Sequence, residues 1–94
     1  MYTPVPALAE AIAVGGSSAP FDLEMSGGAF YLFTSDVACW IAQGEDPTAT
    51  AGPGSMHVGA GRDVKIAGTN GAKLAVIRAG DEGGMASLAP LQSW

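Results

Sequence analysis

Residues Ala29–Gly44, AFYLFTSDVACWIAQG, hold four of the seven aromatic residues of the chain and its only cysteine. Aromatic and β-branched residues fill both halves of this stretch, and the polar residues 34–36 separate them. Such halves favour β-strands. The pattern predicts a β-hairpin formed by Ala29–Phe33 and Val37–Gln43, whose inward side chains form the middle of a core.

The second half of the stretch has two unlike faces, because alternate side chains of a strand point in opposite directions. One face carries Val37, Cys39 and Ile41, and the other carries Trp40 between two alanines. Cys39 has no Lys, Arg or second Cys nearby to activate it, so we expect a buried core thiol. Trp40 is either a core anchor or a surface platform for a partner or a sugar ring.

The rest of the chain repeats short apolar–polar alternations bounded by turn residues. Further strands are expected at Leu8–Val14, Phe21–Met25, Met56–Val58, Arg62–Ala67, Ala72–Ala79 and Met85–Leu91. The first of these is rich in alanine but short for a helix, so a strand is favoured. Asn70-Gly71 predicts a two-residue hairpin turn. The chain is therefore predicted to be all-β, a small antiparallel β-sandwich or jelly-roll-like barrel of about eight short strands.

The 94 residues are long enough for one domain, which we assign to residues 8–91. Residues 1–7 form an extended N-terminal arm, because Pro4 and Pro6 restrict the backbone. Residues 92–94 form a C-terminal tail. The polar segment 44–55 is a long loop, and such loops are usually functional, mobile or held by a neighbour. Since 17 alanines and 14 glycines leave few large apolar side chains, we expect homo-oligomerisation or docking to assist stability.

The charge distribution argues against several classes of partner. The net charge is −5, so the chain offers no electrostatic footprint for nucleic acid. No apolar run approaches the roughly 18 residues that a membrane span needs, so we expect no membrane partner. A single cysteine excludes an intramolecular disulfide framework and fits assembly in a reducing cytosol.

No constellation of residues predicts an enzyme, a metal site or a cofactor site. His57 is the only histidine and lacks a catalytic or metal-binding set, so it is interpreted as a surface or interface residue. The acidic pairs Glu45-Asp46 and Asp81-Glu82 lie in glycine- or proline-rich turns, where carboxylates are usually solvated. Glycines 52–61 lack the Gly-Lys-Ser/Thr ending of a phosphate-binding loop.

Aromatic residues at both ends of the chain are candidates for contact with a partner. Tyr2 and Trp94 lie outside the expected strands, and Trp and Tyr are frequent interface anchors. Trp94 has three open alternatives: docking into a neighbour, packing on its own domain, or disorder. The candidate partner contacts are Tyr2, Pro4, Trp40, Glu45, Asp46, Pro47, Pro53 and Trp94.

Five short motifs resemble those of small virion proteins of tailed bacteriophages. They lie at Ile12–Ala19, Asp36–Ile41, Gly44–Thr50, Gly59–Gly61 and Lys73–Ile77. The resemblance covers roughly residues 8–91 and is one of pattern, since the motifs are low in complexity. Proteins of this group have a β-sandwich or jelly-roll-like domain.

The resemblance implies a non-enzymatic capsid decoration, or cement, protein that binds and stabilises the assembled head shell. Its partners are then the major capsid protein or neighbouring virion subunits, and its location is the virion, assembled in the cytoplasm of the bacterial host. Two alternatives remain open at this stage. One is a head–tail connection or tail- or fibre-associated protein, and the other is a carbohydrate-binding sandwich with Trp40 and Tyr31 as stacking platforms.

Overall fold

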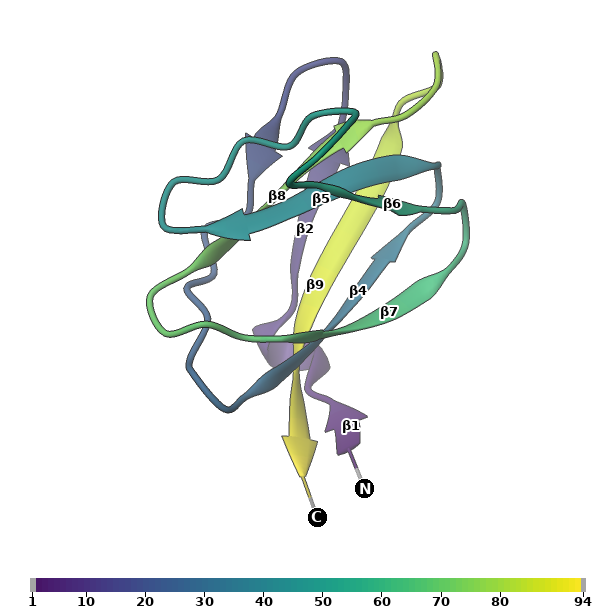
Figure 1. The fold of residues 1–94 in the computed structure, drawn as a ribbon. Helices are drawn as coiled ribbons and strands as arrows, with labels where there is room; N and C mark the ends of the chain where they lie inside the picture. Colours follow the sequence, from purple (N-terminus) through teal and green to yellow (C-terminus); the bar gives the residue numbers. More distant parts are fainter. Residues whose placement is uncertain (1, 94) are drawn as a thin grey trace.

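The computed structural model describes residues 2–93, which form nine strands and one short 3₁₀ turn (Figure 1). The elements are β1 (Tyr2–Pro4), η1 (Pro6–Leu8), β2 (Glu10–Val14), β3 (Ala19–Pro20), β4 (Phe30–Ser35), β5 (Cys39–Gly44), β6 (Met56–Val58), β7 (Asp63–Ala67), β8 (Lys73–Arg78) and β9 (Gly84–Ser93). Within this part of the chain, no helix has the length and apolarity to cross a membrane.

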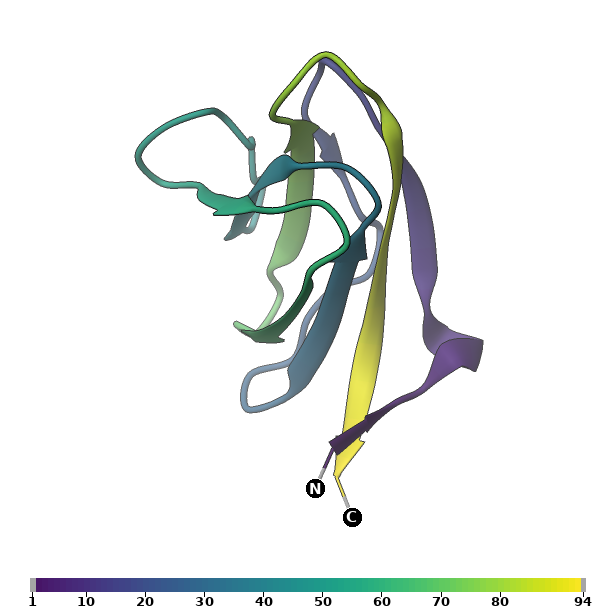
Figure 2. The ribbon, with the colours of Figure 1, turned by 90° about the vertical axis from the view of Figure 1, so that its right-hand side faces the viewer.

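The strands form two antiparallel sheets that pack face to face as a sandwich (Figure 2). In the five-stranded sheet, β9 pairs with β4 on one side and with β1 and β2 in succession on the other, and β7 pairs with β4. The four-stranded sheet has the order β3-β8-β5-β6. The predicted all-β sandwich is confirmed, and it is not closed into a barrel.

The predicted hairpin of residues 29–43 is wrong, because its two halves belong to different sheets. β4 lies in the five-stranded sheet and β5 in the four-stranded sheet. Between them the buried hydroxyl of Ser35 donates to the Val37 carbonyl at 2.7 Å, and the Asp36 amide donates to the Met85 carbonyl. These bonds carry the chain over the edge of the core, so the inward side chains of the two strands face each other across the sandwich.

The hairpin predicted at Asn70-Gly71 is also wrong, since β7 and β8 lie in different sheets. A type I′ hairpin turn needs a positive φ at both central residues. Here only Gly71 has one, at +80°, and the Ala72 amide bonds to the Thr69 carbonyl at 3.0 Å. These are the features of a type II turn, which does not match the twist of a two-strand ribbon.

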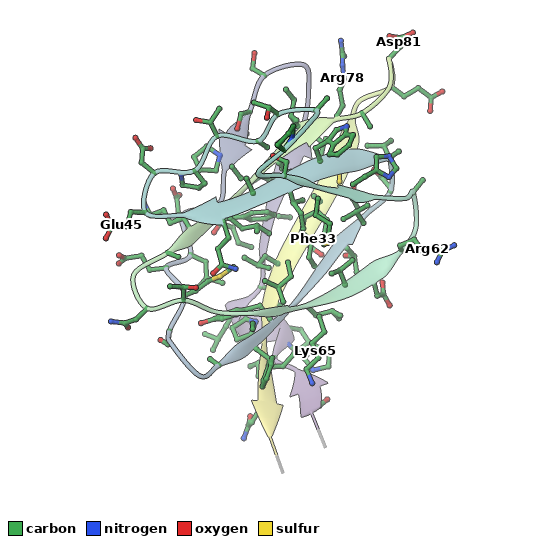
Figure 3. All side chains as sticks on the ribbon, in the orientation of Figure 1. Phe33, Glu45, Arg62, Lys65, Arg78 and Asp81 are labelled. Atoms are coloured by element: carbon green, nitrogen blue, oxygen red, sulfur yellow. The ribbon has the colours of Figure 1, made fainter. Side chains whose placement is uncertain are left out.

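The core lies between the sheets and contains the side chains that strand alternation predicts. Phe33 is fully buried and meets Phe21 edge to face, with 6.2 Å between ring centroids. Figure 3 shows Phe33 inside the sandwich. Other core side chains are Val14, Met25, Tyr31, Cys39, Ile41, Val58, Leu74, Val76 and Leu88. The expected strand from Leu8 starts instead at Glu10, because Pro6–Leu8 forms the η1 turn and leaves Leu8 60% exposed.

Phe21–Met25 has the predicted alternation of burial but no regular strand. Phe21 and Met25 are buried, and their amides donate to the carbonyl of Leu74 in β8 and to that of Ala72, just before β8. The amides of Asp22 and Leu23 are instead bound by the carboxylate of Glu10, each at 2.8 Å. Backbone hydrogen bonds from this segment to the region of β8 are therefore limited to its two end residues, Phe21 and Met25.

Candidate functional site

Trp40 lies on the outer face of the four-stranded sheet. Its neighbours Cys39 and Ile41 point inward and are buried, so the Trp40 face is the one that points away from the core. On the outer face Trp40 stands between Ile77 of β8 and His57 of β6. The rings of Trp40 and His57 meet edge to face, with 5.2 Å between centroids. Trp40 is half-buried and His57 exposed, so part of the indole surface is accessible from solvent.

The loop of residues 45–55 folds back against its own domain. β5 and β6 are the only consecutive strands among residues 2–93 that pair with each other, and this loop joins them. Ala49 is buried in a small cluster with Ala42 and Ala75, and its amide donates to the Ser18 hydroxyl at 2.9 Å. The Thr50 amide donates to the Ser55 hydroxyl at 3.1 Å. The loop is thus held by the outer face of the sheet that carries Trp40.

Five of the candidate contacts therefore lie along β5 and its loop. Glu45, Asp46 and Pro53 are exposed, while Pro47 is half-buried like Trp40. Figure 3 shows Glu45 at the periphery of the molecule, where the loop leaves β5. This region therefore carries both the Trp40–His57 ring pair and the acidic, proline-containing loop of residues 45–55.

The remaining candidates lie at the other end of the fold, in a two-stranded ribbon formed by β1 and the last residues of β9. Tyr2 pairs with Ser93 and Pro4 with Leu91, so the two chain ends leave the sandwich side by side (Figures 1 and 2). The segments expected to be an extended N-terminal arm and a C-terminal tail therefore pair with each other as strands. Pro4 is exposed, whereas Trp94 and the side chain of Tyr2 lie outside the described part of the structure.

Two acidic residues have structural roles that sequence reasoning did not find. The Glu10 carboxylate binds the amides of residues 22 and 23, and the Asp36 carboxylate accepts a hydrogen bond from the Met85 amide at 2.8 Å. A carboxylate that binds backbone amides fixes the path of a loop. The acids of the two predicted solvated pairs, at positions 45–46 and 81–82, are exposed.

Cys39 and Tyr31 both lie inside the sandwich. Burial raises the pKa of the Cys39 thiol, an effect that a hydrogen bond with Ser35 partly opposes, so the buried core thiol is as predicted. Across residues 2–93, no three His, Cys, Asp or Glu side chains converge as a metal site. Tyr31 is not a stacking platform, because its ring is buried and its hydroxyl accepts a hydrogen bond from the Ser26 amide.

No protein-family model, curated protein or solved structure matches this chain.

Proposed function

We propose that this chain is a non-enzymatic structural protein of a bacteriophage virion, which decorates the assembled capsid shell and stabilises it. The observation that carries the proposal is the β1–β9 ribbon, because it brings both chain ends to one end of a rigid sandwich. β1 pairs with β9 on one side only, so its second edge is available to a strand of a shell subunit. Residues 1–9 and 83–94 contain no charged side chain, which suits insertion between subunits.

The stabilisation follows from mass action. A protein that binds the assembled lattice and not the free subunits shifts the equilibrium towards the assembled state. At a free concentration of about 100 times its dissociation constant, each bound copy contributes about 2.7 kcal/mol. Many copies on one shell add to a large effect even when each contact is weak.

The test is cosedimentation of the purified chain with shells assembled from the major capsid protein, followed by thermal disruption of the shells. We expect saturation at many copies per shell and a higher disruption temperature. Deletion of residues 92–94 is expected to abolish binding, whereas Asp81→Asn, in an exposed turn far from the ribbon, leaves it unchanged. No binding, or binding without a change in disruption temperature, would contradict the proposal. Saturation at about 6 or 12 copies would favour the head–tail alternative.

A second candidate is a carbohydrate-binding module, and the partly exposed indole of Trp40 favours it. A half-buried indole on a flat sheet face can stack on a sugar ring, while the edge-to-face contact with His57 holds the indole in place. The test is titration of tryptophan fluorescence with a glycan panel, using Trp94→Phe to isolate the Trp40 signal. A flat response across the panel would exclude this candidate.

A further inference from the structure

On the outer face of the five-stranded sheet, the outward positions of β2, β9 and β4 carry no charged residue, although the Lys65 ammonium of β7 lies over the Phe30 ring of β4, 4.3 Å from its centroid. Along β9 the side chains of Met85, Ser87 and Ala89 point outward, since Ala86 and Leu88 belong to the core between the sheets; Ala89 is nevertheless buried, at 8% exposure. Their outward neighbours on β2 and β4 are small or apolar, and none is charged. We call this surface the neutral face. It is unusual in a chain whose net charge is −5.

The neutral face carries a knob and a hollow. The knob is Leu8, which is 60% exposed on the η1 turn, and Figure 2 shows this turn standing out on the side away from the other sheet. The chain leaves the sheet after Val5, whose amide bonds to the Pro90 carbonyl, and returns to it at Glu10, which pairs with Leu88. Measured along β9, Leu8 therefore lies at about the position of Ala89, which we call its level. The hollow, of about 320 Å³, lies around Ser87.

The hollow lies at the level of Ser87, between Ala11 of β2 and Thr34 of β4. Met85, which is 51% exposed, forms its far wall. The knob and the hollow are therefore two residues apart along β9, on opposite sides of the level of Leu88.

Asp36 lines the hollow, where its carboxylate accepts a hydrogen bond from the Met85 amide. Two further charged residues border this face on β7, with the same spacing as the knob and the hollow. Asp63 and Lys65 point outward from β7, at the levels of Ser87 and Ala89 respectively. A rotation of 180° about an axis that crosses the strands at Leu88 exchanges these two levels. One operation therefore brings the knob of one copy to the hollow of another, and Asp63 of each copy to Lys65 of the other.

We propose that the neutral face is a two-fold interface between two copies of this chain, with its axis crossing β9 at Leu88. The contact is isologous, so each favourable contact occurs twice. The same axis places Met85 against Leu91 of the second copy, which covers another exposed apolar side chain. The inference is independent of the proposed virion role, because it concerns the chain in isolation.

The area of the face fits a weak, reversible pair. The five strands of the sheet hold 29 residues, which at about 3.3 Å along and about 4.8 Å across the strands span a plane of about 460 Å². The accessible surface exceeds this plane because side chains project from it. A standard interface buries about 800 Å² per partner, which is about one sixth of the 5160 Å² of this molecule.

The first test is sedimentation velocity of the isolated chain from about 1 μM to about 1 mM. We expect a reversible monomer–dimer equilibrium. Leu8→Gln is expected to weaken dimerisation at least about tenfold while the protein still folds, because Leu8 lies outside the core. A chain that stays monomeric throughout the range, or a dimer that Leu8→Gln leaves unchanged, would overturn the proposal.

The second test exchanges the two charges on β7. Recovery of the dimer in the double variant is expected only if the proposed axis places residue 63 opposite residue 65 of the second copy. Asp63→Lys and Lys65→Asp each place like charges opposite each other, so each is expected to weaken the dimer several-fold. The double variant Asp63→Lys/Lys65→Asp restores opposite charges and is expected to restore the dimer. The controls Asp81→Lys and Arg78→Asp make the same charge changes at sites far from Lys65 (Figure 3). Weakening by the single variants without recovery in the double variant refutes the two-fold axis, as does equal weakening by the controls.

Discussion

The carboxylate of Glu10 is expected to be one of the strongest single anchors of this fold outside the core. It accepts hydrogen bonds from the amides of Asp22 and Leu23, both at 2.8 Å, and so attaches the segment that carries the buried Phe21 to β2. The change to test is Glu10→Gln, which keeps the size of the side chain. It replaces one acceptor oxygen with an NH₂ group that faces a backbone donor.

The magnitude follows from these two bonds. A hydrogen bond to a charged group contributes about 1.5–3 kcal/mol, and the bond to Asp22 is exposed to water, so the lower part of that range applies. Glu10→Gln loses one bond and weakens the other, and we expect a loss of about 2 kcal/mol in the free energy of unfolding. For a domain of this size that loss lowers Tm by about 8–16 °C.

The assay is thermal and urea unfolding followed by circular dichroism, together with amide hydrogen exchange. The matched control is Glu24→Gln, which removes the same charge from an exposed carboxylate on the same segment. We expect the control to stay within about 0.5 kcal/mol of the parent protein. In Glu10→Gln the amides of residues 22 and 23 should exchange faster than in the parent protein. The amides of β9 should keep the same ranking of exchange rates among themselves. If the two variants melt at the same temperature, the anchoring role of Glu10 is refuted.

Three further predictions concern the backbone and the core thiol. Gly68→Ala should cost about 1–3 kcal/mol in urea unfolding, because the new Cβ would lie 2.6 Å from the Ser26 carbonyl oxygen and 2.7 Å from the Tyr31 ring; Gly44→Ala, with no atom within 4 Å, is the tolerated control. Asn70→Pro should leave stability unchanged or raise it by up to about 1 kcal/mol, since proline suits the second position of a type II turn; a large loss of Tm would contradict this turn type. Burial raises the pKa of the Cys39 thiol above its ordinary value of 9.0, so its contribution to stability is present below pH 9 and is lost as pH rises towards the higher folded pKa. Unfolding titrations from about pH 8 to pH 10 should therefore show a steeper fall in the parent protein than in Cys39→Ala, and identical slopes would contradict the shift.

Local sequence pattern was sufficient to predict the all-β class and most of the core. Side chains alternate along a strand with a period of two, so spacing alone placed Cys39 and Ile41 on the face opposite Trp40, while the structure decided that the Cys39 face is the buried one. The same alternation identified Phe21 and Met25 as inward residues, although that segment is not a regular strand. Burial depends on which face of the strand a residue occupies, and the residues beside it in the sequence indicate that face.

Strand pairing could not be predicted in this way. Both predicted hairpins instead join strands of different sheets, because the turn residues at positions 34–36 and 68–71 are compatible with either connection. What distinguishes the two outcomes is a set of bonds between distant residues, such as the Asp36 amide with the Met85 carbonyl. Sequence spacing carries no information on such bonds.

For the candidate surfaces, the sequence by itself determined which residues are chemically suited to contact: an indole among alanines, an acidic loop, and aromatic residues at both ends. Only the tertiary structure decided where they lie. It placed Trp40 on the outer face beside His57, folded the loop onto that face through Ala49, and paired Tyr2 with Ser93. It also assembled the neutral face from strands at the two ends of the chain. The physical reason is that composition and alternation are local properties, whereas a surface is formed by the order of strands in a sheet, which long-range backbone hydrogen bonds and core packing select together.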